Sequence, residues 1–323
     1  LPLTERLRLT CGVRVEDVRM KIESLKGETV ERDTMFSGSL WFTEPFPSVA
    51  LRYTPRARTN FRFSFARTYD LPTFREIGPY ASTDPAIKEN QVGNPDLLPS
   101  IINSTDFGWE WFVAPGEFIA VGAFVKSIRD PIVEEPLRFT SDEQPQRRWE
   151  NSSDGWVYGT ELEFRKSLDF IYIGLADLSV GGNLTLMKSK VQRTLTAVDV
   201  RSARSENPSE PTRPLYASPY VINAGMAYDN EALGLGTSVY FNVFGRRVVH
   251  HNLYGGPDLI EHPRPELNFT FEKAFKRNAK VKLAAKNLLN PEYKEYREYK
   301  DDVYTQYTHR GGVSISVGLS YTL

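Results

Sequence analysis

The chain has 323 residues, with 40 basic and 41 acidic side chains and a formal net charge of -1. This balance gives no indication of a nucleic-acid partner or of an acidic substrate. No apolar run approaches the length of a membrane-spanning helix, which excludes a helical membrane protein. The single cysteine, Cys11, cannot form an internal disulfide.

Aromatic residues are abundant, yet the chain is polar on average. It contains 19 Phe, 16 Tyr and 5 Trp, and its mean hydropathy is -0.41. A β-barrel that turns apolar side chains to lipid and polar ones to a wet lumen produces this combination. The chain begins at Leu1 without a signal peptide, so we expect a mature form or a piece of a longer protein.

Side chains alternate between apolar and polar along almost the whole chain, which predicts β-strands. In chain order we predict about twelve of them, near residues 5–20, 46–54, 60–70, 102–113, 117–128, 155–166, 172–190, 217–229, 234–247, 265–275, 279–288 and 312–323. The stripe of the eighth strand runs from Tyr220 through Ile222, Ala224 and Met226 to Tyr228. A tyrosine at each end of an apolar stripe is typical of the aromatic girdles at two membrane interfaces.

Short and long connections alternate between the predicted strands. Short turns are expected at 54–59, 114–116, 229–232 and 276–278, and long polar loops at 71–101, 129–154, 191–216, 248–264 and 289–311. This order predicts an all-β, antiparallel transmembrane β-barrel with its long loops on one side. Because long loops usually have a function, we expect that side to collect a ligand.

Several motifs in this order resemble TonB-dependent receptors of the outer membrane. The run 60–68 (NFRFSFART) is followed by 72–76 (PTFRE) and 93–99 (GNPDLLP). The runs 158–166, 213–220 and 286–291 and the last strand are also similar to that family, although Leu323 stands where a terminal aromatic is usual.

The resemblance implies that residues 1–323 form about twelve strands of a 22-stranded barrel. The family's N-terminal plug and energy-coupling box have no counterpart in these residues, so we expect them in a missing N-terminal part. The implied location is the outer membrane of a Gram-negative bacterium, with the long loops at the cell surface. Haem-importing relatives carry a histidine between the motif that ends at 72–76 and the motif at 93–99. No histidine occurs from Thr73 to Pro95 here, which argues against haem as the ligand.

Aromatic and imidazole side chains in the predicted loops are candidates for ligand contact. They are Tyr80, Trp149, His250, His251, Tyr254, His262, Tyr296 and Tyr304. Imidazole is the commonest transition-metal ligand, so His250, His251 and His262 could contact a metal or metal chelate, or be solvated loop residues. The tyrosines from Tyr293 to Tyr307 are interleaved with charged residues, a combination that suits binding of a sugar, an aryl siderophore or a peptide. The alternative is that strands extending above the membrane expose these tyrosines without any ligand contact.

Charged side chains on the polar faces of the strands are expected to line the lumen. They are Arg14, Arg62, Glu110, Glu161, Glu163, Arg165, Glu272, Lys280 and Lys282, and we expect them to pair with one another and with a plug. Asn94, Pro95, Leu97 and Pro99 are expected to end a loop and set the entry to the next strand, with ligand contact as the alternative. No nucleophile arrangement or phosphate-binding glycine loop is found, so neither an enzyme nor a cofactor is expected.

The favoured hypothesis is active uptake of a scarce nutrient such as a ferric siderophore, cobalamin, an oligosaccharide or a peptide. The implied partners are the TonB energy-coupling complex, the barrel-assembly machinery, and outer-membrane lipid and lipopolysaccharide; a surface lipoprotein is a further candidate partner. The alternative is a non-transporting barrel that acts as an adhesin, a pore or an assembly platform.

Overall fold

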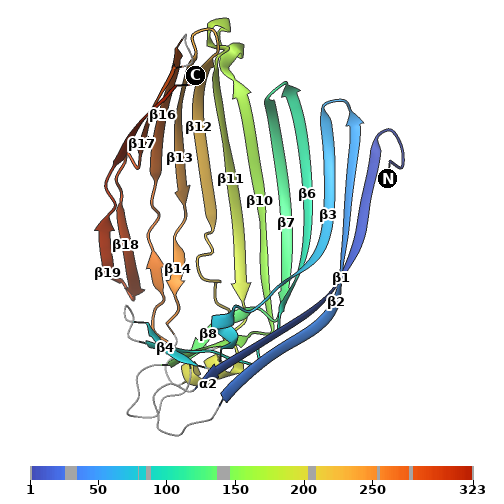
Figure 1. The fold of residues 1–323 in the computed structure, drawn as a ribbon, viewed down its shortest axis with the longest axis vertical. Coiled ribbons are helices and arrows are strands. Elements are labelled where there is room, and N and C mark those ends of the chain that lie inside the picture. Colours follow the sequence, from blue (N-terminus) through green and yellow to red (C-terminus); the bar gives the residue numbers. More distant parts are fainter. Residues whose placement is uncertain are drawn as a thin grey trace.

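The structure, a computed structural model, describes residues 2–25, 35–78, 80–84, 89–136, 146–202, 209–252, 255–275 and 279–321. Twelve long strands stand side by side in one antiparallel sheet, here called the wall (Figure 1). In wall order they are β1 (Leu7–Leu25), β2 (Met35–Arg56), β3 (Thr59–Asp70), β6 (Ser100–Ala114), β7 (Glu117–Arg129), β10 (Asp154–Ser167), β11 (Leu178–Val191), β12 (Tyr220–Asn230), β13 (Leu235–Phe244), β16 (Glu266–Phe275), β17 (Ala279–Lys286) and β20 (Ser314–Tyr321).

The wall confirms the predicted fold class and all twelve predicted strands. Every wall strand pairs with its sequence neighbours in the wall, and the sheet is open, with β1 at one edge and β20 at the other. None of the helices in the described part of the chain is long and apolar enough to cross a membrane.

The registers bring the predicted apolar stripes onto one face of the wall. Leu162 lies opposite Val121 in β7, and Leu184 lies opposite Ile222 in β12. Many of these side chains are exposed, including Phe63, Phe107, Val121, Leu162, Phe164, Met226, Val317 and Leu319. A continuous exposed apolar face of this size suits lipid and not water.

Tight turns join wall strands at one end of the sheet. Gly116 between β6 and β7 has a φ of 78°, and Gly234 between β12 and β13 has a φ of 58°. Glycine reaches this left-handed region without steric cost, so both turns can stay short. The predicted turn at 276–278 lies outside the described residues.

At the other end, the long connections contain short elements that the alternation did not predict. The helices there are α1 (Phe74–Ile77) and α2 (Leu195–Ser202). The 3-10 turns η1 (Leu168–Phe170) and η2 (Ile173–Leu175) lie instead at the tight-turn end, where they connect β10 and β11 (Figure 1). The strands are β4 (Ala81–Asp84), β5 (Glu89–Val92), β8 (Ile132–Pro136), β9 (Gln146–Asn151), β14 (Arg247–His250), β15 (Leu259–Glu261), β18 (Glu292–Tyr299) and β19 (Asp302–Arg310).

The short strands form two additional four-stranded sheets, in the orders β4-β5-β9-β8 and β14-β15-β18-β19. We call these sheets, with α1, α2 and the segments between them, the loop layer (Figure 1, where β4, β8 and α2 lie at the lower end and β14, β18 and β19 above them). The loop layer corrects the expectation of unstructured connections, because strands from different loops pair with one another.

The hairpin of β1 and β2 is longer than predicted. Its far part runs toward the loop layer (Figure 1), where Gly38 lies against Pro95. The sequence predicted this strand only from about residue 46. Pro45 and Pro47 lie within the longer strand, although proline cannot donate a ladder hydrogen bond. These prolines are tolerated because β3 pairs with β2 only from Ser48 onward, which leaves this part of β2 unpaired on one side.

Candidate functional site

The loop layer is held by a small apolar core of its own. Ile77, Leu97 and Trp149 are buried together, from α1, from the segment before β6 and from β9. Met20 and Ile22 of β1 pack against them, so the core joins two loops to the far part of the hairpin. Arg75 lies over the Trp149 ring at 5.4 Å.

Asn94 cross-links this layer through its side-chain amide. Its Nδ2 donates to the carbonyl of Trp149 at 2.9 Å, and its Oδ1 accepts from Arg148 at 2.5 Å and from the Asp96 backbone at 3.1 Å. The side chain is buried. The sequence placed Asn94 correctly at the end of a loop, but its tertiary contacts are an additional finding.

Arg147 ties together two connections more than a hundred residues apart in sequence. Its side chain is 98% buried and lies 3.4 Å from Glu134. The same guanidinium donates to the carbonyl of His251 at 3.0 Å and contacts the ring of His250. Buried charge is stable only when paired in this way, so Arg147 fixes the 129–154 loop against the 248–264 loop.

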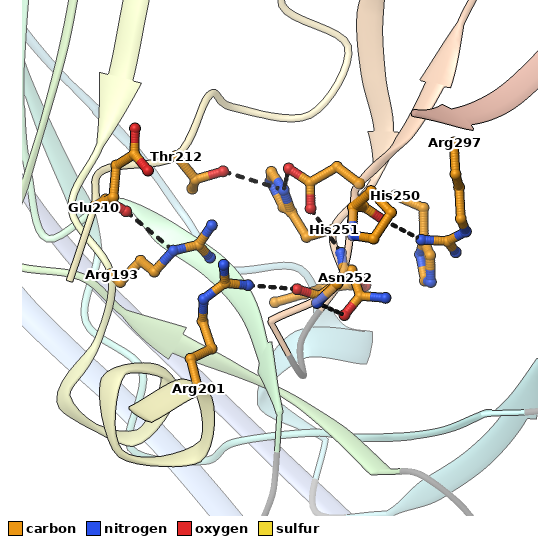
Figure 2. Close-up of polar contacts among 12 residues, drawn as sticks. Arg193, Arg201, Glu210, Thr212, His250, His251, Asn252 and Arg297 are labelled. Atoms are coloured by element: carbon orange, nitrogen blue, oxygen red, sulfur yellow. Dashed lines mark hydrogen bonds and ion pairs between the residues drawn. The ribbon is translucent and has the colours of Figure 1, made fainter. Parts of the chain in front are cut away.

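A second network surrounds His251, which is also buried (Figure 2). Its Nδ1 lies 3.2 Å from the Thr212 hydroxyl and 3.5 Å from Asp258. Asp258 also accepts the Asn252 N–H at 2.7 Å. Burial alone would raise the pKa of Asp258, but the contacts to His251 and Asn252 outweigh it and lower that pKa.

Beside this network lies a cavity of about 360 Å³ rich in arginine, which we call the arginine cavity. Five guanidinium groups line it, from Arg193, Arg201, Arg213, Arg246 and Arg247, against three carboxylates, from Glu210, Asp258 and Glu298. Two of the arginines are neutralised by partners. Arg246 pairs with Glu298 at 3.4 Å and Arg247 with Glu261 at 2.7 Å.

The other arginines of the cavity carry no carboxylate partner among the described residues. Arg193 donates to the Glu210 backbone carbonyl at 3.1 Å, and Arg201 donates to the Asn252 carbonyl at 2.7 Å (Figure 2). Arg201 is 91% buried, and its Nε is buried without a hydrogen-bond acceptor in the described structure. Burial, and next the nearby charge of Arg193, lower the pKa of Arg201.

Glu135 lies at the edge of this group. It is buried and accepts the Thr194 N–H at 3.4 Å, next to the start of α2. Burial raises its pKa to about 7, against the lowering effect of the Thr194 N–H and of Arg193. Glu135 therefore changes its charge near neutral pH, within electrostatic reach of Arg193 and Arg201.

The predicted ligand residues are distributed unevenly over the loop layer. His250 and His251 lie beside Arg147 and the cavity network, and Trp149 is in the apolar core. Tyr296 is buried and its ring lies 6.2 Å from that of the exposed His262, whereas Tyr80 and Tyr304 are exposed. Tyr254 lies outside the described residues. Ligand contact by any of them remains a prediction.

The described residues contain no group of three or more His, Cys, Asp or Glu side chains arranged to hold a metal ion. His250, His251 and His262 therefore have structural neighbours but no shared ligand geometry. The arginine cavity was missed by the sequence analysis. Its only visible signal is the number of arginines in 191–216 and the Arg246–Arg247 pair.

Charged side chains on the other face of the wall follow the expected pattern in part. Arg62 pairs with Glu110 at 3.0 Å, and Lys280 pairs with Glu272. Arg14 pairs with Glu16 at 2.8 Å. Pairing of this face with a plug stays a prediction.

Comparison with known proteins agrees with this architecture. Several solved structures match nearly the whole chain at low identity. A mutant of the ferric enterobactin receptor PfeA from Pseudomonas aeruginosa has a TM-score of 0.59 at 13% identity, over 97% of this chain and 44% of its own. The copper transporter OprC has a TM-score of 0.68 at 13% identity, over 99% and 46%.

The ferric yersiniabactin uptake receptor FyuA from Yersinia pestis has a TM-score of 0.61 at 14% identity, over 98% of this chain and 43% of its own. The chain thus spans less than half the length of these three structures, and the similarity shows the fold alone. No curated protein matches the sequence.

A family model described as "TonB dependent receptor-like, beta-barrel" matches residues 1–288. Proteins of this family are receptors and transporters of the Gram-negative outer membrane. With its open antiparallel wall and its structured loop layer, the chain belongs to the TonB-dependent receptor-like β-barrel family.

Proposed function

We propose that this chain is the wall and loop layer of an outer-membrane receptor that takes up an anionic metal chelate by energy-dependent transport. The arginine cavity indicates that the ligand is an anion, because three of its arginines have no carboxylate partner in the described structure. The proposal that the ligand contains a metal is supported by the solved neighbours, whose names refer to ferric enterobactin, ferric yersiniabactin and copper.

Capture at the loop layer follows from the chemistry of the cavity. Guanidinium groups bind carboxylate, phosphate and related oxyanions through charge-assisted hydrogen bonds. Arg193, Arg201 and Arg213 all line the cavity without a carboxylate partner in the described structure, so a bound anion would offset their charge.

In this proposal the long loops face the cell surface, a plug upstream of these residues closes the lumen, and the TonB complex supplies the energy. The domain assignment of residues 1–323 as the C-terminal part of a 22-stranded barrel belongs to the same proposal. The barrel-assembly machinery would insert the wall. The alternative of an adhesin, pore or assembly platform has no specific support in the geometry.

The size of the native polypeptide tests this proposal. We would measure its intact mass, by mass spectrometry, in the outer-membrane fraction of the source cells. A mass of about twice the 36.8 kDa of this chain, or more, is expected, because the wall has twelve strands and a plugged receptor about 22. A mass near 36.8 kDa would leave no room for a plug and would overturn active import.

A further inference from the structure

A second cavity, which shares only Arg213 with the lining of the arginine cavity, lies where β11 leaves the apolar face of the wall. The apolar stripe of β11 includes Leu178, Val180, Leu184 and Leu186. On the same face it continues as Lys188 and Lys190, and both lysines are exposed. From Leu178 to Leu186 the strand rises about 27 Å, close to the height of the apolar band of an outer-membrane barrel.

Aromatic side chains mark this level as a membrane interface. Tyr158 of β10 lies opposite Lys188, and Trp156 lies opposite Lys190. On the other side, Tyr220 of β12 lies opposite Leu186. Tyrosine and tryptophan collect at the boundary between lipid tails and headgroups, so the two lysines stand at headgroup level.

The cavity forms because the chain bulges away from β11 at this point. Thr212 bridges to Val191 and Tyr220 pairs with Leu186, so residues 213–219 lie opposite only 187–190. The Met187 N–H donates to the Pro219 carbonyl at 2.9 Å and holds the bulge in place. The space left has a volume of about 320 Å³.

Every charged group that lines this cavity is positive. Its lining consists of Tyr158, Met187, Lys188, Ser189, Lys190, Arg213, Ala217 and Pro219. In the described structure, no carboxylate pairs with Lys188, Lys190 or Arg213. Among other wall lysines of the described structure, Lys166 and Lys280 have an acidic partner, whereas Lys126 and Lys282 on the opposite face have none.

We propose that this cavity binds a phosphate group of a glycolipid of the outer leaflet, such as lipopolysaccharide, whose acyl chains then cover the apolar face below. Lysine and arginine beside a membrane attract anionic lipid headgroups and can extend their apolar stems along the lipid. A soluble anion would gain nothing from the adjoining apolar stripe. The inference rests on the proposed orientation of the loop layer toward the cell surface, and it adds a lipid site to the proposed receptor.

The test uses the full-length receptor purified from outer membranes and stripped of lipid. Native mass spectrometry would measure binding of phosphorylated lipid A, of lipid A without its phosphates, and of inorganic phosphate. The double variant Lys188→Gln/Lys190→Gln is compared with Lys126→Gln/Lys282→Gln, a matched pair on the other face of the wall. We expect phosphorylated lipid A to bind the first variant roughly thirtyfold more weakly than the natural protein, and the matched pair to bind normally.

Equal losses in both double variants, or no loss in either, would overturn the inference. Binding of lipid A without phosphates at full strength would also overturn it. Inorganic phosphate bound as tightly as lipid A would show a site for a soluble anion instead. Metal accumulation by cells carrying Lys188→Gln/Lys190→Gln should stay normal, so failure of this site is distinguishable from failure of the proposed function.

Discussion

Gly93 lies so close to Gly78 that a Cβ atom at position 93 would come within 1.8 Å of the Gly78 carbonyl oxygen. The same backbone segment is joined to α1, because the Asn94 N–H donates to the Glu76 carbonyl at 2.6 Å. Glycine is required here for the close approach of two backbones, and not for an unusual φ angle. The contact sets the position of Asn94 and thereby of the loop-layer core.

Gly93→Ala should therefore open the loop layer while the wall stays folded. A contact of 1.8 Å cannot be accommodated without moving the backbone, so Asn94 would lose its bond to the Trp149 carbonyl. Limited proteolysis should cut the variant faster within 71–101, with unchanged strand content by circular dichroism. Gly108→Ala is the matched control, because the nearest atom to its added Cβ would be 4.0 Å away. Equal sensitivity of both variants would contradict this prediction.

Arg201→Met should weaken anion binding at the arginine cavity by about tenfold or more. The change keeps much of the side-chain volume but removes the buried charge and the unpaired Nε–H. Isothermal titration of the full-length receptor with sulfate, used as a simple dianion probe, measures the effect. Arg246→Met is the control, since Glu298 already neutralises that arginine. A loss of affinity in the control alone would contradict the assignment of Arg201.

Sulfate affinity should fall as the pH rises through about 7. Glu135 has its pKa raised by burial to about 7, so it is neutral below that pH and adds a negative charge near Arg193 and Arg201 above it. The charge of sulfate itself does not change over this range, so any change of its affinity with pH comes from a titrating group of the protein. Titrations between pH 5.5 and 8.5 should show the fall in the natural protein and a much smaller one in Glu135→Gln. An unchanged slope in Glu135→Gln would exclude Glu135 as the group responsible.

The wall could be predicted from the sequence because its strands are long and alternate strictly. Stripes such as Val281 to Ala285 are fixed by the side-chain period of two, which needs no tertiary information. The limits of β2 were predicted less well, because the strand was expected near 46–54 and begins at Met35. The added part includes Pro45, which is tolerated because β3 pairs with β2 only from Ser48 onward. The start of β11 was predicted near residue 172, whereas the strand begins at Leu178, because η1 and η2 occupy 168–175.

The loop layer could not be predicted, because it is assembled from short segments that are distant in sequence. Strands of three to six residues, such as β9 and β15, show too few alternations to be recognised, and their partners lie in other loops. The arginine cavity combines Arg193 and Arg201 with Arg246 and Asp258, and no sequence spacing encodes that proximity. The histidines were recognised as loop residues, but their contacts with Arg147 and Asp258 were not.

Energy-dependent accumulation of metal tests the central claim most directly. Cells lacking this protein, and the same cells complemented with the natural receptor, would be grown under metal limitation with and without an uncoupler of the proton-motive force. Cellular iron, copper and cobalt would then be measured by elemental mass spectrometry. We predict that the complemented cells accumulate more of one metal and that the uncoupler removes the difference. A difference that survives the uncoupler, or equal contents of all three metals, would contradict active uptake of a metal chelate.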